Sequence, residues 1–163
     1  MFDILPSEAI PESVAVADGM QSAVAEARRS FRKLPRTPER DSVLNTLGRV
    51  GKPNLKRKVR FRAKVILDEL GGGFDGLCEV TDEAVNCRNH YVHGTDSPID
   101  YNRELGTRFF LTDTLEFVFA ASDLVEAGWD IGKWIRERPG QFHPFGMYRL
   151  GYQENRKKLE SLL

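Results

Sequence analysis

Apolar residues recur at spacings of three and four along most of this 163-residue chain. Because an α-helix places such positions on one face, the pattern is typical of amphipathic helices. No stretch of useful length alternates between apolar and polar residues, as a half-buried strand would. The sequence therefore predicts an all-α fold, with helices over about residues 10–33, 37–47, 55–70, 77–93, 99–127, 129–138 and 147–163.

Glycine, proline and short polar side chains mark the expected ends of these helices. Asn54 is suited to cap the N-terminus of helix 55–70, and Asp75 or Thr81 that of helix 77–93. Pro98 is suited to the first turn of helix 99–127. We expect the last helix to be exposed and charged, and Gly151 should weaken it by up to about 1 kcal/mol.

The longest predicted helix, 99–127, is apolar over more than one stripe. Its aromatic positions include four phenylalanines: Phe109, Phe110, Phe117 and Phe119. A helix of this kind must be covered on two sides, either by a bundle core and a partner chain or by a full surround of helices. The pattern leaves both arrangements open.

Length and composition are those of a soluble globular protein. Hydrophobic residues make up 40% of the chain and charged residues 29%, and no apolar run approaches the length that spans a bilayer. The N-terminal stretch has an acid and an early proline where a signal peptide has a basic region and an apolar core. We therefore expect one domain over residues 1–163, in the cytoplasm and without membrane contact.

Cysteine and histidine usage gives no sign of a disulfide or a metal centre. Cys78 and Cys87 fall on one predicted helix, about 13 Å apart along its axis, which is beyond disulfide reach. The chain has three histidines and no Cys/His cluster at zinc spacing. We expect reduced thiols, no metal site and no cofactor.

The net charge is zero, but the charges are distributed unevenly. Residues 28–64 hold fourteen Lys or Arg against two acids, a net of +12, so the rest of the chain carries −12. Seven of these cations fall within residues 52–64. Such a run is often a solvated helix face, yet like charges repel one another unless they face a polyanion or the acidic half of the chain. We favour nucleic-acid binding, through Lys56, Arg57, Arg60 and Lys64.

Helix 77–93 ends in a cluster of polar side chains. At about 100° per residue, Asn89 and His93 share a face, while Arg88 lies about 140° from His93. His90 points elsewhere, and for it we prefer a surface or intramolecular hydrogen-bonding role. The cluster should flank a buried apolar stripe formed by Leu77, Val80, Ala84, Val85, Tyr91 and Val92.

Two interpretations of Arg88, Asn89 and His93 follow from their chemistry. One is a solvated helix face whose asparagine caps the helix end. The other is a ribonuclease site, since RNA carries its own nucleophile, an imidazole exchanges protons near neutral pH, and a guanidinium stabilises a phosphate. A second proton-transfer group is then missing, and a two-fold dimer would supply it through His93 of the partner subunit.

The pattern Arg-Asn-x-x-x-His formed by these three residues resembles the RNase motif of the HEPN superfamily. The segment from Arg108 to Trp129 resembles the long helix after the motif in the C-terminal HEPN-like domain of ApeA-type anti-phage defence proteins. The resemblance covers roughly the last two thirds of the chain. It implies a HEPN-like helical bundle with a long central helix after the motif helix.

The resemblance also implies a function. Arg88, Asn89 and His93 would be the catalytic residues of a metal-independent endoribonuclease in anti-phage defence or a toxin system. The alternative is a catalytically inactive module that binds nucleic acid or dimerises. In ApeA-type proteins the domain follows a larger N-terminal sensor, so the expected partners are RNA, a second copy of the chain, and a sensor domain or partner protein outside this chain.

Overall fold

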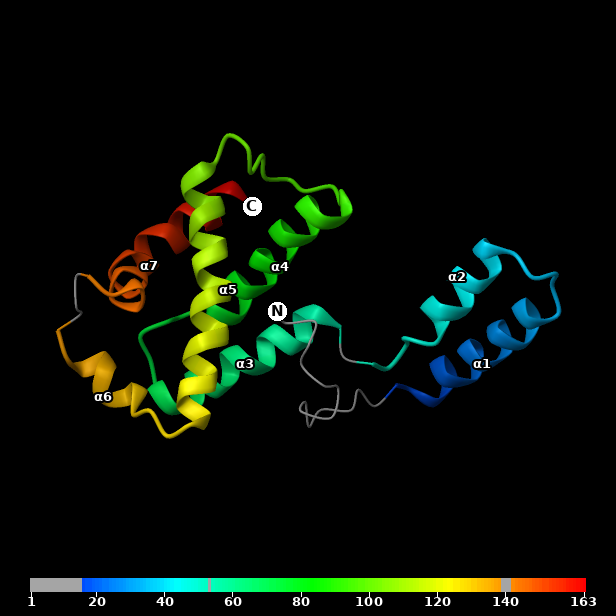
Figure 1. The fold of residues 1–163 in the computed structure, drawn as a ribbon, viewed down its shortest axis with the longest axis horizontal. Helices are drawn as coiled ribbons and strands as arrows, with labels where there is room; N and C mark the ends of the chain where they lie inside the picture. The colour runs from blue at the N-terminus through cyan, green and yellow to red at the C-terminus, as the bar shows by residue number, and fades with distance from the viewer. Residues whose placement is uncertain (1–15, 53, 139–141) are drawn as a thin grey trace. The chain divides into compact units, whose positions relative to one another are not determined.

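A computed structural model describes residues 16–52, 54–138 and 142–163, and in this part of the chain every regular element is a helix (Figure 1). The all-α prediction is confirmed. The described residues divide into two compact units, residues 16–54 and residues 55–163, which are described separately. The single domain expected over residues 1–163 stays a prediction.

The first unit is a helical hairpin of α1 (Asp18–Arg32) and α2 (Pro38–Leu47), which pack against each other. Thr37 caps α2 by accepting a hydrogen bond from the Arg40 backbone N–H. The Arg40 guanidinium donates to the carbonyls of Phe31 and Arg32, which are in the last turn of α1. Residues 10–15 of the predicted first helix lie outside the described residues, and α1 begins at Asp18.

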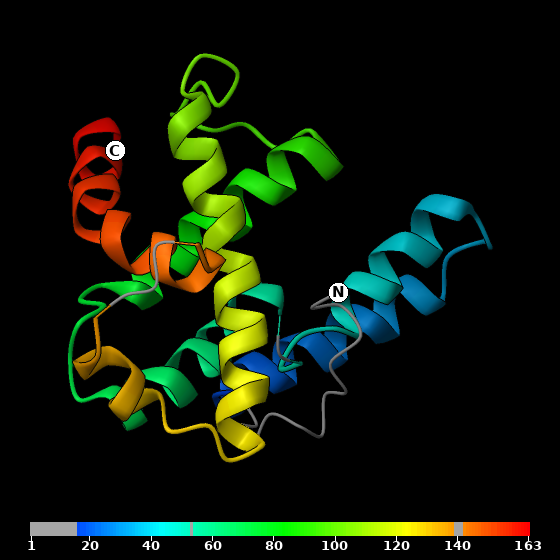
Figure 2. The same cartoon turned by 60° about the vertical axis from the view of Figure 1, so that its left-hand side comes forward.

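The second unit is built on three helices that all pack on one another, α3 (Leu55–Leu70), α4 (Leu77–His93) and α5 (Leu105–Glu126). In both Figure 1 and Figure 2, α5 crosses α3 and α4. The short α6 (Ile131–Arg136) packs on α3, and α7 (Pro144–Leu162) packs on α5. The predicted long helix after the motif helix is therefore the central element of this unit.

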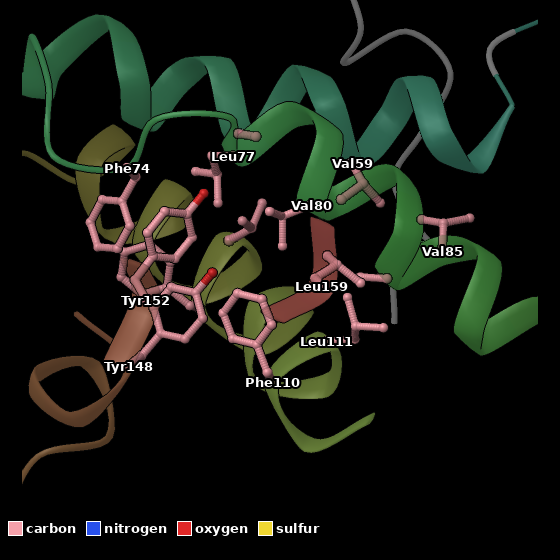
Figure 3. Close-up of a cluster of buried hydrophobic side chains, with 14 of the residues drawn as sticks. Val59, Phe74, Leu77, Val80, Val85, Phe110, Leu111, Tyr148, Tyr152 and Leu159 are labelled. Carbon is pink, nitrogen blue, oxygen red and sulfur yellow. The ribbon is translucent and has the colours of Figure 1, made fainter. Parts of the chain in front are cut away.

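The core of this unit has an aromatic end and an aliphatic end (Figure 3). Phe74 meets Tyr152 edge to face at 4.8 Å, and Phe117 stacks on Tyr148 at 4.7 Å between ring centroids. Burial raises the pKa of Tyr148, whose hydroxyl shares a hydrogen bond of 2.9 Å with Thr114. The tyrosines therefore remain protonated and satisfy their polar atoms inside the core.

The expectation of an exposed last helix is wrong, because α7 contributes a full face to this core. Tyr148, Tyr152 and Leu159 are buried, and they recur at spacings of four and seven along α7. The Tyr152 hydroxyl also donates to the Asp75 carbonyl, at 2.9 Å. The charged residues that dominate the composition of α7 hid this stripe.

The predicted start of the central helix is also wrong, since α5 begins at Leu105 and not at residue 99. The Asp100 carboxylate accepts hydrogen bonds from the backbone N–H groups of Asn102 and Arg103, so it forms a turn in place of a helix. Ile99 and Tyr101 are nevertheless buried, and they anchor this turn in the core.

The motif helix α4 has the predicted bounds, residues 77–93, but different caps. Its N-cap is Gly76 in a left-handed conformation, with no side-chain cap from Asp75 or Thr81. Gly94 ends the helix, with a φ of +65° that disfavours residues other than glycine. Two left-handed glycines therefore delimit the helix that carries the motif.

The remaining expectations concern cysteines, tryptophans and the membrane. Cys78 and Cys87 are both unpaired thiols on α4, as predicted. Trp129 and Trp134 are partly buried against the core. No helix in the described ranges is long and apolar enough to cross a membrane.

Candidate active site

The three motif residues meet at the C-terminal end of α4. Nη1 of Arg88 lies 2.9 Å from Nε2 of His93 and 3.1 Å from Oδ1 of Asn89. Arg88 and His93 are separated by about 140° around the helix, but a long arginine side chain spans that angle. One guanidinium nitrogen of Arg88 therefore contacts both other motif residues.

The contact between Arg88 and His93 is compatible with one tautomer of the imidazole. A guanidinium has only donors, so Nε2 of His93 must be the acceptor. In that arrangement His93 is neutral and carries its proton on Nδ1. A neutral imidazole whose Nε2 carries a lone pair is the form from which a general base acts.

The neighbouring His90 has a structural environment. Its Nδ1 lies 2.8 Å from the Thr95 carbonyl oxygen and therefore donates to it. Its ring packs edge to face on Tyr91 and Tyr101, with centroids 5.2 and 5.5 Å away. The predicted intramolecular hydrogen-bonding role of His90 is confirmed.

A second network connects α4 to the turn that precedes α5. Tyr101 donates to the buried Glu83 carboxylate at 2.6 Å, and Asn86 donates to the same carboxylate at 2.8 Å. Burial and this hydrogen bond raise the pKa of Tyr101, which keeps the hydroxyl protonated. The turn is thereby held against the helix that bears the motif.

A groove of about 750 Å³ runs between α4 and α5 beside the motif. Arg88 lies in its wall, and most of the remaining wall is apolar, including Leu111, Leu115 and Phe119. Cys87 also lines the groove, and burial raises its pKa to about 11, so it stays a thiol near neutral pH. The groove therefore combines an apolar surface with the arginine of the motif.

Tyr91 and Val92 were expected in the buried stripe of α4, and this expectation is wrong. They are 48% and 56% exposed, although Leu77, Val80, Ala84 and Val85 are buried as predicted. Tyr91 and Val92 line the α4–α5 groove, so they continue the apolar stripe into an open surface. Helical spacing correctly placed them on that stripe but could not show where its cover ends.

The sequence analysis did not identify two residues at this site, Asn102 and Arg108. The Tyr91 hydroxyl donates to Oδ1 of Asn102 at 3.1 Å, and Arg108 approaches the same hydroxyl at 3.5 Å. Arg108 is twenty positions beyond Arg88, so no spacing rule connects the two. Only the packing of α5 on α4 brings them into one groove.

The predicted RNA-binding residues form one face of α3. Lys56, Arg57, Arg60 and Lys64 fall within an arc of about 100°. Arg60 makes a two-pronged ion pair with Asp82 of α4, through contacts of 2.8 and 2.7 Å, and this hydrogen bonding raises the pKa of Arg60. Asp82 shares a helical face with Asn89 and His93, so the ion pair joins the basic face to the motif face.

Arg62, also within the basic run, points inward. Its buried guanidinium pairs with Asp123 and with Glu126 of α5, the latter at 2.7 Å. It therefore stabilises the packing of α3 on α5 and is not part of the basic face. Among the described residues there is no group of three or more His, Cys, Asp or Glu side chains that could hold a metal ion.

An all-α unit whose central helix packs on a helix bearing Arg-Asn-x-x-x-His is of HEPN type. The chain belongs to the Apea-like HEPN family, whose family model matches residues 12–132. This match covers most of the chain, including α1 to α5 and the complete motif. No curated protein and no solved structure matches the chain.

Proposed function

We propose that the protein is a metal-independent endoribonuclease that acts in anti-phage defence or a toxin system. The observation that carries the proposal is the 2.9 Å contact between Arg88 and His93 on the motif helix of a HEPN family member. Asn89 accepts from the same guanidinium and orients it. Arg88 therefore contacts both other motif residues before any substrate binds.

The reaction proposed for this site uses the nucleophile of RNA itself. Nε2 of His93 takes the proton of the 2′-hydroxyl, and the 2′-oxygen forms a bond to phosphorus while the bond from phosphorus to the 5′-oxygen breaks. The products are a 2′,3′-cyclic phosphate and a 5′-hydroxyl. Arg88 stabilises the charge that develops on the phosphate oxygens.

The leaving 5′-oxygen needs a proton, and we propose that His93 of the partner subunit in a two-fold dimer donates it. Apolar side chains around the motif support such pairing. Tyr91 and Val92 of α4 and Phe109 of α5 are about half exposed or more, an unusual position for large apolar groups in a monomer. The dimer would place two motif helices next to each other.

The proposal also covers the domain organisation, the location and the partners of the protein. The family match spans residues of both structural units, which supports one HEPN-like domain over residues 1–163. A cytoplasmic location and a sensor domain or partner protein beyond this chain complete the proposal. The alternative is an inactive module that binds nucleic acid or dimerises through the same surfaces.

Cleavage in the presence of a chelator tests the proposal directly. We expect the purified protein to cut labelled single-stranded RNA with EDTA in excess, because neither His93 nor Arg88 needs a metal for the steps above. RNA with 2′-O-methyl groups should stay intact, since it lacks the nucleophile. Cleavage of that control would contradict the proposed reaction, and RNA binding without any cleavage would favour the inactive module.

The basic face of α3 gives a second prediction. Replacing Lys56, Arg57 and Lys64 by Gln should weaken RNA binding and flatten its salt dependence, by about 0.7 in log–log slope for each lost phosphate contact. Arg60 is left unchanged because its replacement would leave Asp82 without its ion-pair partner.

The measurement is RNA affinity as a function of salt concentration, with a matched variant as control. Lys133, Lys157 and Arg138 are exposed cations outside α3, and their replacement by Gln removes the same charge. Equal effects of the two triple variants would make the basic face an ordinary solvated surface.

A further inference from the structure

Arg108, in the first turn of α5, is a partly buried cation without an acidic partner. Its guanidinium lies 5.9 Å from the centre of the Tyr91 ring and 5.3 Å from that of Phe109. It also contacts the Tyr91 hydroxyl at 3.5 Å. No carboxylate within the described ranges lies at ion-pair distance from it, in contrast to Arg60 and Arg62.

This guanidinium shares the α4–α5 groove with the motif arginine. Arg88 of α4 and Arg108 of α5 both line this groove, and Tyr91, which Arg108 contacts, is three residues beyond Arg88. Three residues correspond to about 4.5 Å along a helix axis. Arg108 therefore reaches α4 within one turn of Arg88, at the end of the groove next to the motif.

The surroundings hold Arg108 in place but do not neutralise it. Asn102 accepts from the Tyr91 hydroxyl and so orients the ring that Arg108 covers. Glu116 is the one carboxylate that lines the described groove, but it is eight residues along α5, about 12 Å from Arg108 along the axis. The end of the groove next to the motif is thus positively charged.

We propose that Arg108 binds the phosphate adjacent to the scissile one, so that the site requires RNA with at least two successive phosphates. This inference rests on the proposed ribonuclease function. A guanidinium is suited to the task because its planar donors match phosphate oxygens in pairs. Arg88 would then hold the reacting phosphate while Arg108 fixes the register of the strand.

A double-substitution cycle between protein and RNA tests this assignment. The probes are oligoribonucleotides with a 2′-deoxy sugar at the position that the wild-type protein cuts, so that binding is measured without cleavage. In each, one phosphate flanking the scissile one is replaced by an uncharged methylphosphonate. We expect one such replacement to weaken binding to the wild-type protein by about tenfold or more, as for a lost hydrogen bond to a charged group.

Arg108→Gln should weaken binding of the unmodified probe by a similar factor and should be insensitive to that methylphosphonate, because the same contact is already absent. Arg108→Lys should restore part of both effects. Arg103→Gln is the matched control, since Arg103 is 88% exposed and pairs with Asp100 in the preceding turn. It should behave like wild type, and thermal unfolding verifies that each variant is folded.

The outcomes separate the inference from the function on which it rests. Suppose that the protein binds the probes and that Arg88→Ala weakens this binding. If the effects of Arg108→Gln and of each methylphosphonate are then additive, the assignment of Arg108 is overturned, while the proposed ribonuclease function is not. If the wild-type protein binds none of the probes, both fail. If Arg108→Gln does not fold, the comparison of wild type with Arg108→Lys decides the question. The methylphosphonate should weaken binding to the wild-type protein, and it should weaken binding to Arg108→Lys by a smaller factor.

Discussion

His93→Ala should lower the rate of RNA cleavage by about 100-fold to 10,000-fold, the contribution of general acid–base catalysis. Nε2 of His93 is the hydrogen-bond acceptor in the contact with Arg88, whereas the ring of His90 is bound to the Thr95 carbonyl. Arg88→Ala should have a comparable effect, because it removes both the phosphate ligand and the group that positions His93. Single-turnover cleavage of labelled RNA measures both rates.

Folding should survive both substitutions. His93 is exposed and Arg88 is only partly buried, so truncation opens no core cavity and should cost at most about 1 kcal/mol. His90→Ala is the matched control on the same helix. It loses a hydrogen bond to the Thr95 carbonyl, yet it should keep most activity. A His93→Ala protein that cleaves at the wild-type rate would remove the motif from the mechanism.

The same variants test the two-fold site. The proposed site uses His93 from both subunits, so an excess of His93→Ala protein should inhibit the wild-type protein by forming inactive mixed dimers if subunits exchange. Light scattering at micromolar concentration supplies the independent measurement of dimer formation. A strictly monomeric protein whose activity is unaffected by excess His93→Ala protein would leave the second proton without a donor.

The sequence was sufficient to predict the fold class and the motif helix. The C-terminal end of α4 follows from Gly94, whose left-handed conformation ends a helix, and the buried residues Leu77, Val80, Ala84 and Val85 follow from the helical period. The motif residues could be chosen because their pattern resembles the HEPN RNase motif, since spacing alone left a solvated helix face as an alternative. Their contact through Nη1 of Arg88 needed the side-chain conformation, which spacing alone does not give.

Features that depend on tertiary packing could not be predicted. The turn before α5 arises because the Asp100 side chain competes with helix formation, and Tyr101 then becomes a buried donor to Glu83. The inward direction of Arg62 depends on Asp123 and Glu126, which are more than sixty residues away. Arg108 joins the motif groove for the same reason, since it comes from another helix.

Two phenylalanines of α5 differ in burial in a way that the sequence could only suggest. Phe117 is 1% exposed and packs against Phe74, Phe145 and Tyr148, with ring centroids 4.7 to 5.1 Å away. Phe109, on the same helix, is 58% exposed. The identical substitution at these positions therefore tests the core and the open surface independently.

Phe117→Ala should lower the free energy of unfolding by about 3 to 5 kcal/mol, because it removes a large buried side chain and leaves a cavity where α5, α7 and the loop residue Phe74 meet. A domain stable by about 5 to 15 kcal/mol would lose much of its stability. Phe109→Ala should change it by less than about 1 kcal/mol in the monomer, since little surface becomes newly exposed. Urea unfolding followed by circular dichroism measures both.

For dimer formation we expect the opposite order, with the larger effect from Phe109→Ala and the smaller from Phe117→Ala. If Phe109 belongs to the two-fold interface, Phe109→Ala should shift the dimer toward monomer at a given concentration and reduce RNA cleavage with it, while Phe117→Ala should not alter association as long as it stays folded. A Phe109→Ala protein that keeps both its dimer and its activity would remove this face of α5 from the interface. A loss below 1 kcal/mol in Phe117→Ala would contradict the packing of the aromatic core around it.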